Sequence, residues 1–439
     1  MKLYRHINWY QILFFIQLLY SVLELTKSIP KGCKRRNTRR FVSFLCIFFV
    51  GTYIVCTPVC QYLKNNRKEP TTWSECERII SKNSWCFFSK IGNWFCAGKK
   101  PTETEVYSRY EEKGCNDVKE EFFPHPSPTQ EERDFPIAYA MVVFTNADLV
   151  EKVLQSIYMP QNVYCIHVDV KSSEAFRKAI RAMTACLDNV FLTDKTVDVI
   201  WPHVSILHAQ INCLGDLMKS SVKWKYFMHV TGQEFPLYNN AEIVRALANL
   251  NGSNNIESYA VPINNWHRYM YSHRADKVEG GQFYARYSWR RTNVTKRPPP
   301  WGIRIKKGSN FVALTREAAS YILYDKVAID FLSWLNDTSS PDEAFYSSLH
   351  QHPGFPGGIY GSQPEWIMRA VSWEYTGDVC FGQWIREVCW LTTRDLNWVL
   401  GANFRKKIFV TKIPFDHRDD IVKCLALARS IRRYGQVLL

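Results

Sequence analysis

The sequence lacks the short motifs that mark several common ligand sites. It has no CxxC pair and no HExxH segment, so a zinc site is not expected. It has neither GxGxxG nor GxxxxGKS/T, which leaves a dinucleotide fold and a P-loop unsupported. Zinc-finger spacing, a basic region leading into heptads and an RNP-like segment are absent as well. These absences make nucleic acid the weakest candidate among anionic partners.

The chain is strongly basic. It carries 56 Lys and Arg residues against 41 Asp and Glu residues, a formal net charge of +15 over 439 residues. Apart from nucleic acid, this charge predicts a phosphate-bearing metabolite or an anionic membrane surface as the partner. Apolar content of 46% and charged content of 22% are typical of a globular protein. The length allows one large domain or two ordinary ones.

Part of the charge lies directly before a long apolar run. Residues 31–40 contain six cations, and residues 41–63 contain no charged residue. That run is long enough to cross a hydrocarbon core of about 30 Å, and the cations predict that residues 1–40 stay cytoplasmic. No cleavage site follows, so we expect a type II signal anchor. The apolar stretch 7–23 is expected to be an interfacial helix or a dispensable extension, with a second crossing as the alternative.

Cysteines and glycosylation sequons agree with a lumenal region after the anchor. Ten of the 14 cysteines lie beyond it, and an even number in an oxidising compartment predicts up to five disulfides. The three sequons also lie beyond it and are expected to carry glycans if this region is lumenal. They are at Asn251, Asn293 and Asn336.

The remaining chain divides into a polar stem, residues 64–134, and a folded domain, residues 135–439. From residue 137 onward, continuous apolar runs alternate with segments of helical spacing. This order predicts an α/β fold with a mainly parallel sheet flanked by helices, of the nucleotide-binding kind. Ligands bind such sheets at the carboxyl ends of strands, where Asp169 is expected. The alternative interpretation is that Asp169 is a turn residue or caps a helix.

The stretch SSPDEAFYSSLH, residues 339–350, places two acids side by side behind a proline. Ser340 suits an N-cap, and Pro341 suits a first helical position. Asp342 and Glu343 would then face the positive end of the helix dipole. This local pattern favours a structural role for both acids and leaves a catalytic role open.

Several longer segments resemble the core-2/I-branching β-1,6-N-acetylglucosaminyltransferases (glycosyltransferase family 14). They cover roughly residues 130–430. They are IYMPQNVYCIHVDVKSSEAF, WKYFMHVTGQEFPLYNNAEIVRAL, KGSNFVALTREAASYIL, SSPDEAF, WEYTGD and REVCWLTTRDLNWVL. The resemblance implies a GT-A-like fold in a Golgi type II membrane protein with a lumenal catalytic domain. It also implies inverting, metal-independent transfer of GlcNAc from UDP-GlcNAc. The acceptor would be the 6-hydroxyl of a sugar on a core-2 O-glycan or an I-type chain.

The resemblance assigns Glu343 as the catalytic base and leaves Asp342 a supporting role. Arg386 and Lys412 would compensate the charge of the UDP leaving group in place of a metal ion. Three extra residues between these two cations leave Lys406 and Lys407 as alternatives to Lys412. The residues implied around the uridine are Val142, Val143, Thr145, Asp169 and Trp201, the last in place of a family tyrosine.

For the acceptor, the resemblance implies Glu257, Arg268, Trp373 and Tyr375, although such aromatic residues are more often part of a core. A nearby family lysine is replaced by Asn265, which leaves the acceptor undecided. The disulfides implied are Cys76–Cys424, Cys115–Cys186, Cys165–Cys213 and Cys380–Cys389. Cys86 and Cys96 have no family partner and could bond each other.

Two other functions compete with this one. A peptide O-xylosyltransferase using UDP-xylose would share the coarser sequence pattern. A non-enzymatic Golgi lectin or scaffold would share the fold, but the presence of Glu343, Arg386 and Lys412 opposes it. A homodimer is possible, and the sequence leaves oligomeric state, linkage selectivity and the role of residues 1–30 open.

Overall fold

The fold is described from a computed structural model of the chain. It covers residues 101–278, 287–358, 365–401 and 406–414, with a few positions between 421 and 429. The predicted anchor at 41–63 and the stretch 7–23 lie outside the described residues, as do Cys76, Cys86, Cys96 and Cys424. Among the helices in the described ranges, none is long and apolar enough to cross a bilayer.

A five-stranded sheet forms the centre of the described region, with the order β10-β4-β1-β2-β3. Four strands run parallel, and β10 pairs antiparallel with β4 at one edge. The predicted mainly parallel α/β sheet is therefore confirmed. The strands are β1 (Ile137–Val143), β2 (Val163–Val168), β3 (Val190–Leu192), β4 (Tyr226–Thr231) and β10 (Ala313–Thr315).

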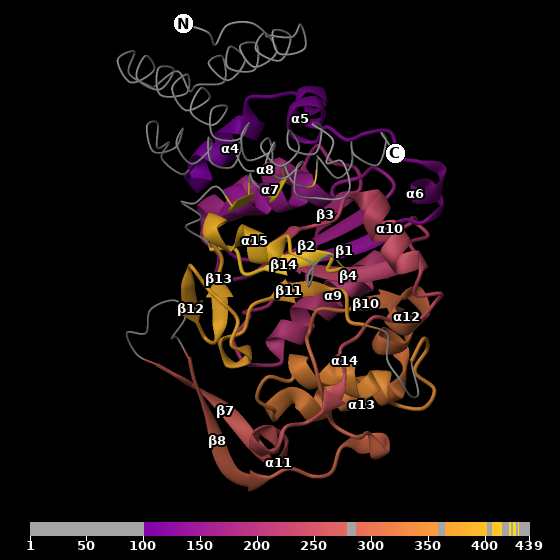
Figure 1. The fold of residues 1–439 in the computed structure, drawn as a ribbon, viewed down its shortest axis with the longest axis vertical. Helices are drawn as coiled ribbons and strands as arrows, with labels where there is room; N and C mark the ends of the chain where they lie inside the picture. Colours follow the sequence, from indigo (N-terminus) through magenta and orange to yellow (C-terminus); the bar gives the residue numbers. More distant parts are fainter. Residues whose placement is uncertain are drawn as a thin grey trace, which may run out of the picture. The chain divides into compact units, whose positions relative to one another are not determined.

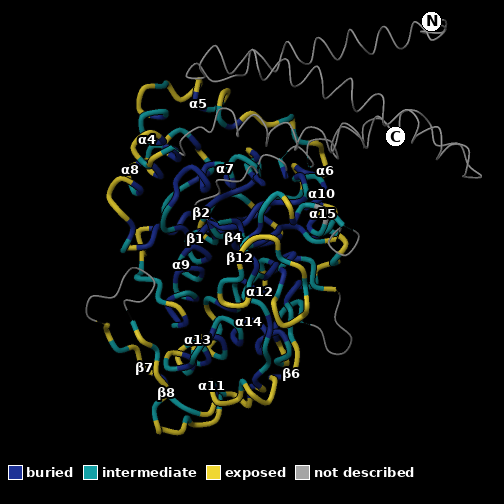
Figure 2. The backbone as a smooth tube through the Cα atoms, turned by 60° about the vertical axis from the view of Figure 1, so that its left-hand side comes forward, coloured by how far each residue is buried: buried dark blue, intermediate teal, exposed yellow. Residues whose placement is uncertain are grey.

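Helices cover both faces of this sheet, which explains why its strands are continuous apolar runs. On β1, Tyr139 and Met141 face one core cluster, and Ala138 and Ala140 face the other. The first cluster includes α7 (Ala147–Ile157) and α8 (Glu174–Thr184). The second includes α9 (Ser205–Lys219), α12 (Arg316–Tyr324), α13 (Lys326–Trp334) and α14 (Asp342–His350). Figure 1 shows these elements, and Figure 2 shows the strands as the most buried part of the backbone.

The described part of the segment predicted as a stem is ordered and packed on this core. It forms α4 (Glu103–Glu111), α5 (Cys115–Phe122) and α6 (Gln130–Asp134). Val106 and Val118 are fully buried in the first cluster. The Glu103 carboxylate accepts hydrogen bonds from the backbone amides of Asn146 (2.9 Å) and Ala147 (2.8 Å). The polar composition of this segment hid a few well-spaced apolar residues, so the compact region begins earlier than predicted.

The described residues also form four smaller sheets. One has the order β11-β14-β5, from β5 (Glu234–Pro236), β11 (Arg369–Val371) and β14 (Phe409–Thr411). Three two-stranded sheets are β6 (Tyr259–Ala260) with β9 (Lys306–Lys307), β7 (Tyr271–Lys277) with β8 (Tyr287–Thr295), and β12 (Gln383–Ile385) with β13 (Val388–Trp390). The remaining helices are α10 (Asn240–Ala248), α11 (His267–Met270) and α15 (Leu396–Val399).

A fully buried ion pair joins the small three-stranded sheet to β4. Glu234 and Arg369 contact each other with no exposed side-chain surface. The Arg369 guanidinium also donates to the His229 carbonyl (2.7 Å). Its central carbon lies 4.3 Å from the ring centroid of Phe311 and 4.2 Å from that of Phe409. An unpaired charge buried at this position would destabilise the fold, so Glu234 and Arg369 must stay in contact. The pair therefore holds β5 and β11 on either side of β14. Lys412 follows directly after β14.

Three of the four predicted disulfides are present in the described residues. They are Cys115–Cys186, Cys165–Cys213 and Cys380–Cys389. The fourth, Cys76–Cys424, lies outside those residues. The three predicted glycosylation residues, Asn251, Asn293 and Asn336, are all exposed.

Candidate active site

The carboxyl ends of β1 and β2 bring most of the predicted uridine-binding residues together. Val142 and Val143 end β1, and Thr145 follows in the loop before α7. Asp169 follows β2, and its amide donates to the Val143 carbonyl at 3.0 Å. This adjacency is what a parallel pair of strands requires.

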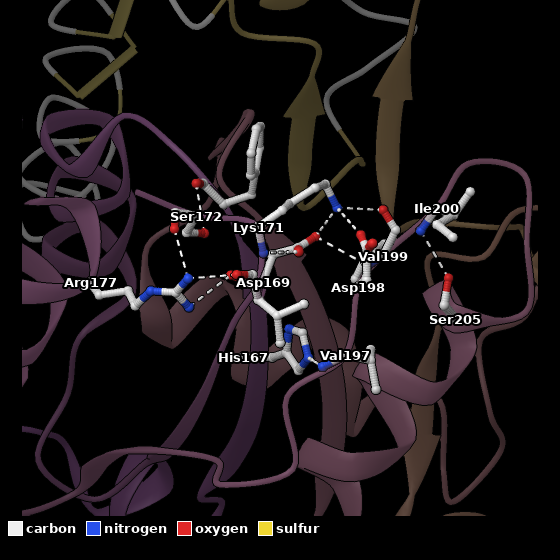
Figure 3. Close-up of polar contacts among 12 residues, drawn as sticks. His167, Asp169, Lys171, Ser172, Arg177, Val197, Asp198, Val199, Ile200 and Ser205 are labelled. Atoms are coloured by element: carbon white, nitrogen blue, oxygen red, sulfur yellow. Dashed lines mark hydrogen bonds and ion pairs between the residues drawn. The ribbon is translucent and has the colours of Figure 1, made fainter. Parts of the chain in front are cut away.

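The Asp169 carboxylate is held at both oxygens (Figure 3). Oδ1 accepts the Lys171 amide (3.0 Å), and Oδ2 accepts the Val199 amide (3.2 Å) and pairs with the Lys171 ammonium. The same ammonium contacts Asp198 Oδ1 (3.2 Å) and the Val199 carbonyl (2.6 Å). Asp169 therefore fixes the loop after β3 against the strand end. A divalent cation at this carboxylate would have to compete with Lys171.

Trp201 lies on that loop and remains 60% exposed. The Arg386 guanidinium lies over its indole ring, 4.2 Å from the centroid. Such a cation–π contact is worth about 0.5–1 kcal/mol at an exposed site. The aromatic residue predicted near the uracil and a cation predicted at the pyrophosphate are thus direct neighbours.

Arg386 is presented by a tight hairpin turn. Ile385 pairs with Val388, so Arg386 and Glu387 form a two-residue loop with φ values of 51° and 64°. Positive φ at both positions is typical of turns that favour Asn-Gly, and it costs side-chain-bearing residues of order 1 kcal/mol or more each. The Glu374 amide donates to the Glu387 carbonyl (2.9 Å), and the Cys380–Cys389 disulfide closes the hairpin. These contacts maintain an unfavourable backbone at the position of the cation.

Lys412 lies close enough to Arg386 for their charges to interact. Burial lowers the pKa of the Lys412 ammonium, the Arg386 charge lowers it further, and Glu234 partly opposes both. Lys406 and Lys407, the alternatives, instead contact the Glu365 carboxylate at 3.1 and 3.7 Å. The arrangement of Arg386 and Lys412 would stabilise an anionic group.

The helix that carries the paired acids begins differently from the prediction. α14 starts at Asp342, and Ser340 has a φ of 51° and makes no side-chain cap. The expected N-cap is therefore wrong. The Ser340 amide instead donates to the Pro202 carbonyl (2.9 Å), and its own carbonyl accepts the Glu343 amide (3.2 Å). This connection ties the start of α14 to the loop that carries Trp201.

Glu343 is a partly exposed carboxylate held by two cations. Its Oε2 lies 2.8 Å from Arg268 Nη1 and 3.0 Å from Lys307 Nζ. Arg268 was predicted at the acceptor site. Lys307 was missed, because in the sequence it reads only as one of two adjacent lysines before the glycine of KKGSNF.

The backbone of Glu257 packs against Gly308, the residue that joins Lys307 to the Glu343 backbone. The Gly308 amide donates to the Glu343 carbonyl (2.9 Å), and a Cβ at Gly308 would lie 1.9 Å from the Glu257 carbonyl oxygen. Burial raises the pKa of the Glu257 carboxyl, and the Ser309 backbone and Lys307 partly oppose that rise. Glycine is therefore required where β9 passes between Glu257 and α14.

Two aromatic residues connect the two halves of the site. Trp373 and Tyr375 have ring centroids 5.4 Å apart, and Tyr375 is 68% exposed. Partial desolvation by neighbouring groups raises the pKa of the Tyr375 hydroxyl, Tyr259, Glu257 and Glu387 act in the same direction, and Lys307 opposes them. The segment thus lies between the Glu257–Lys307 group and the Arg386 turn. Together the residues offer a carboxylate that can accept a proton, cations for an anionic group and aromatic faces for a sugar ring.

Gly308→Ala should destabilise the protein. The added methyl would overlap the Glu257 carbonyl and the Ser347 hydroxyl, so β9 must move away from α14. We expect a loss of at least about 2 kcal/mol in the free energy of unfolding, measured by denaturant titration. Gly215→Ala is the matched control, because its nearest neighbour is 3.8 Å away inside α9 and alanine favours a helix. Equal stability of both variants would contradict the packing described here.

Asp342→Asn should change how stability depends on pH. Burial raises the pKa of Asp342 to about 7, and the adjacent Glu343 charge acts in the same direction. An unfolded aspartate has a pKa of about 3.9, so the folded state binds the extra proton between these values and loses stability as pH rises through them. The variant cannot ionise, and it should gain on the order of 1–2 kcal/mol relative to the wild type between pH 5 and pH 8.

Unfolding free energies across this pH range would test the Asp342 prediction. Asp188→Asn is the control, because that carboxylate is 93% exposed at the surface. It should follow the wild-type curve. An Asp342→Asn curve parallel to the wild type would rule out the raised pKa.

Comparison with known proteins agrees with this arrangement. A family model described as "Branch: Core-2/I-Branching enzyme" matches residues 137–400. The zebrafish (Danio rerio) beta-1,3-galactosyl-O-glycosyl-glycoprotein beta-1,6-N-acetylglucosaminyltransferase 4 is 37% identical over 321 residues, 68% of this chain and 70% of that protein. The N-acetyllactosaminide beta-1,6-N-acetylglucosaminyl-transferases of mouse (Mus musculus) and human (Homo sapiens) are 36% and 33% identical. They are covered over 76% and 83% of their lengths, and they match 70% and 76% of this chain.

The matched region contains the central sheet, Asp169, Trp201, Glu343 and Arg386. The chain belongs to the core-2/I-branching enzyme family.

Proposed function

We propose that the protein transfers GlcNAc from UDP-GlcNAc to the 6-hydroxyl of a sugar acceptor, with inversion and without a metal ion. The observation that carries this proposal is the state of the Glu343 carboxylate. Oε2 is bound by Arg268 and Lys307, whereas no group in the described part of the chain donates to Oε1. A carboxylate oriented in this way can accept a proton from a bound hydroxyl.

The reaction is a single displacement at the anomeric carbon. The acceptor oxygen bonds to that carbon as its proton passes to Glu343 Oε1. The bond between the carbon and the UDP oxygen breaks, and UDP leaves with the electron pair. Arg386 and Lys412 stabilise the charge that develops on the pyrophosphate, and the proton on Glu343 is later released to water.

The Asp169 contacts support the metal-free form of this mechanism. Lys171 and Val199 already bind both oxygens of the Asp169 carboxylate. The positive charge beside this carboxylate is the Lys171 ammonium. Asp169 then acts by holding the loop of Trp201, while Val142, Val143, Thr145 and Trp201 surround the uridine. Charge compensation at the pyrophosphate is left to Arg386 and Lys412.

The acceptor would bind between the base and the aromatic segment. Glu257 and Arg268 lie beside Glu343 and can bind sugar hydroxyls, while Trp373 and Tyr375 present ring faces. Relatives named for both O-glycan and N-acetyllactosaminide acceptors are similar to this chain, so a core-2 O-glycan and an I-type chain are the two acceptors to test.

The same proposal places the catalytic region in the Golgi lumen, behind a type II anchor at residues 41–63. The disulfides at Cys115, Cys165 and Cys380 and the exposed sequon asparagines suit an oxidising compartment with glycosylation. A homodimer is compatible with this placement.

A transfer assay tests the activity. Purified full-length protein would receive UDP-GlcNAc, EDTA and either Galβ1-3GalNAc-aryl or a poly-lactosamine acceptor, with products identified by mass spectrometry and NMR. We expect a β-1,6-linked GlcNAc. Glu343→Gln should lower turnover by at least about two orders of magnitude at unchanged UDP affinity, because the proton acceptor is lost. Glu317→Gln on α12 is the control for the substitution itself.

Four results would count against this proposal. Loss of transfer in EDTA would reject the metal-free mechanism, and near-normal turnover of Glu343→Gln would reject the base. Transfer from UDP-xylose to a serine peptide, with no use of UDP-GlcNAc, would reject the sugar donor. UDP binding without transfer to any acceptor would favour a lectin.

Arg386→Ala should weaken the binding of UDP much more than that of uridine. The pyrophosphate loses a charged partner, typically worth about 1.5–3 kcal/mol, so UDP affinity should fall at least about tenfold by calorimetry. Arg394→Ala is a matched control, because Arg394 is exposed and stacks on Phe381 nearby. Equal losses for uridine and UDP would show that Arg386 acts through Trp201 rather than on phosphate.

A further inference from the structure

Lys307 is a largely buried cation in the site that the predicted residues did not include. Its side chain is 17% exposed, and its Nζ lies 3.0 Å from Glu343 Oε2. The same nitrogen lies 3.3 Å from the Tyr259 hydroxyl and over the Tyr259 ring, 5.7 Å from the centroid. The ammonium is thus directed at the carboxylate rather than at solvent.

The backbone fixes Lys307 relative to α14. Lys307 pairs with Tyr259 in the β6–β9 sheet. The preceding amide, of Lys306, donates to the Ser348 hydroxyl (3.0 Å), and the following amide, of Gly308, donates to the Glu343 carbonyl (2.9 Å). Both neighbours of Lys307 are therefore bound to α14. A side chain held on both sides in this way can orient the carboxylate on that helix.

Lys307 and Arg268 bind the same carboxylate oxygen from different elements. Arg268 Nη1 reaches Glu343 Oε2 from α11 at 2.8 Å, and Lys307 reaches it from β9. Two donors on Oε2 fix the carboxylate plane and leave Oε1 as the oxygen available to a substrate hydroxyl. One cation alone would permit the carboxylate to rotate and exchange its two oxygens.

Several other titratable groups face Glu343. They are Asp342 on the same helix, Glu257 before β6 and Tyr269 on α11, in addition to the two cations. Burial alone would lower the pKa of Lys307, but the contact with Glu343 raises it above its ordinary value. Lys307 and Arg268 are the positively charged groups in contact with the Glu343 carboxylate.

We propose that Lys307 is a positioning residue for the base: it orients Glu343 with Oε1 toward the acceptor and favours the ionised carboxylate. This inference rests on the proposed transfer reaction. It gives Lys307 a role in the pH range over which the enzyme works. The ionised Glu343 carboxylate takes the acceptor proton, and the Lys307 ammonium is one of the two positive charges that contact this carboxylate.

The experiment is the pH profile of turnover and of kcat/KM for Lys307→Met. Removing the positive charge should move the acid limb of the profile to higher pH by about 0.5–1 unit, because ionisation of the base loses a favourable partner. Turnover above the limb should also fall, by about three- to tenfold, because Glu343 loses one of the two cations that orient it, and UDP affinity should not change. Lys307→Arg should restore the limb. Lys306→Met removes the same charge one residue away and should leave the profile unmoved.

Each outcome decides between specific alternatives. A uniform loss at every pH with an unmoved limb, or a profile identical to the wild type, would overturn the role of Lys307. An inactive wild type would instead reject the proposed function. In that case a double-mutant cycle on unfolding, with Lys307→Met, Glu343→Gln and both together, still tests the contact. Non-additive effects would support it, and strict additivity would overturn it.

Discussion

The hydrogen bonds among Asp169, Lys171 and Val199 are the constraint on which the rest of the site depends. They hold the loop after β3 against the end of β2. That loop places Trp201 under the Arg386 guanidinium, and its Pro202 carbonyl accepts the amide that precedes α14. A salt bridge at the edge of the central sheet thereby positions residues in both the donor and the acceptor regions. Without it, the sheet would fix only the residues at its own strand ends.

The cations of the site fall into two groups with different partners. Arg386 and Lys412 lie near each other, and burial and mutual repulsion act against the charge on Lys412. An anion placed between them would relieve this repulsion. Arg268 and Lys307 instead share an acid that belongs to the protein. The first pair is therefore suited to a ligand that leaves with negative charge, and the second pair to keeping an internal group charged.

The strands of the central sheet could be predicted from the sequence, because burial on both faces requires a nearly continuous run of apolar residues. The strands β1 and β2 are apolar except for His167 because helices cover both faces of the sheet. Glu343 required the family resemblance, since its local context also suits an ordinary helix start. Ser340 was misjudged because its amide must reach Pro202, and this tertiary contact overrides its preference for capping.

Other features leave no periodic signal. Lys307 belongs to a strand of two residues, too short for alternation to show, and its partner Tyr259 lies 48 positions earlier in the chain. The helices α4–α6 contain few apolar residues, but Val106 and Val118 are fully buried. In both cases the structure depends on contacts between distant segments, whose pairing a single sequence does not encode in its local composition.

The position of the Cys380–Cys389 disulfide gives the site a chemical weak point. Cys165 and Cys213 are completely buried, whereas Cys380 is partly accessible at the base of the Arg386 hairpin. Because thiol exchange requires access of the attacking thiolate to sulfur, a mild reductant would open the hairpin disulfide and the exposed Cys115–Cys186 disulfide before the buried Cys165–Cys213 disulfide. Opening the hairpin disulfide would remove one of the contacts that hold the Arg386 turn in its left-handed conformation. Ordinary laboratory thiols would thus release the turn that carries Arg386 before they reached the disulfide in the core.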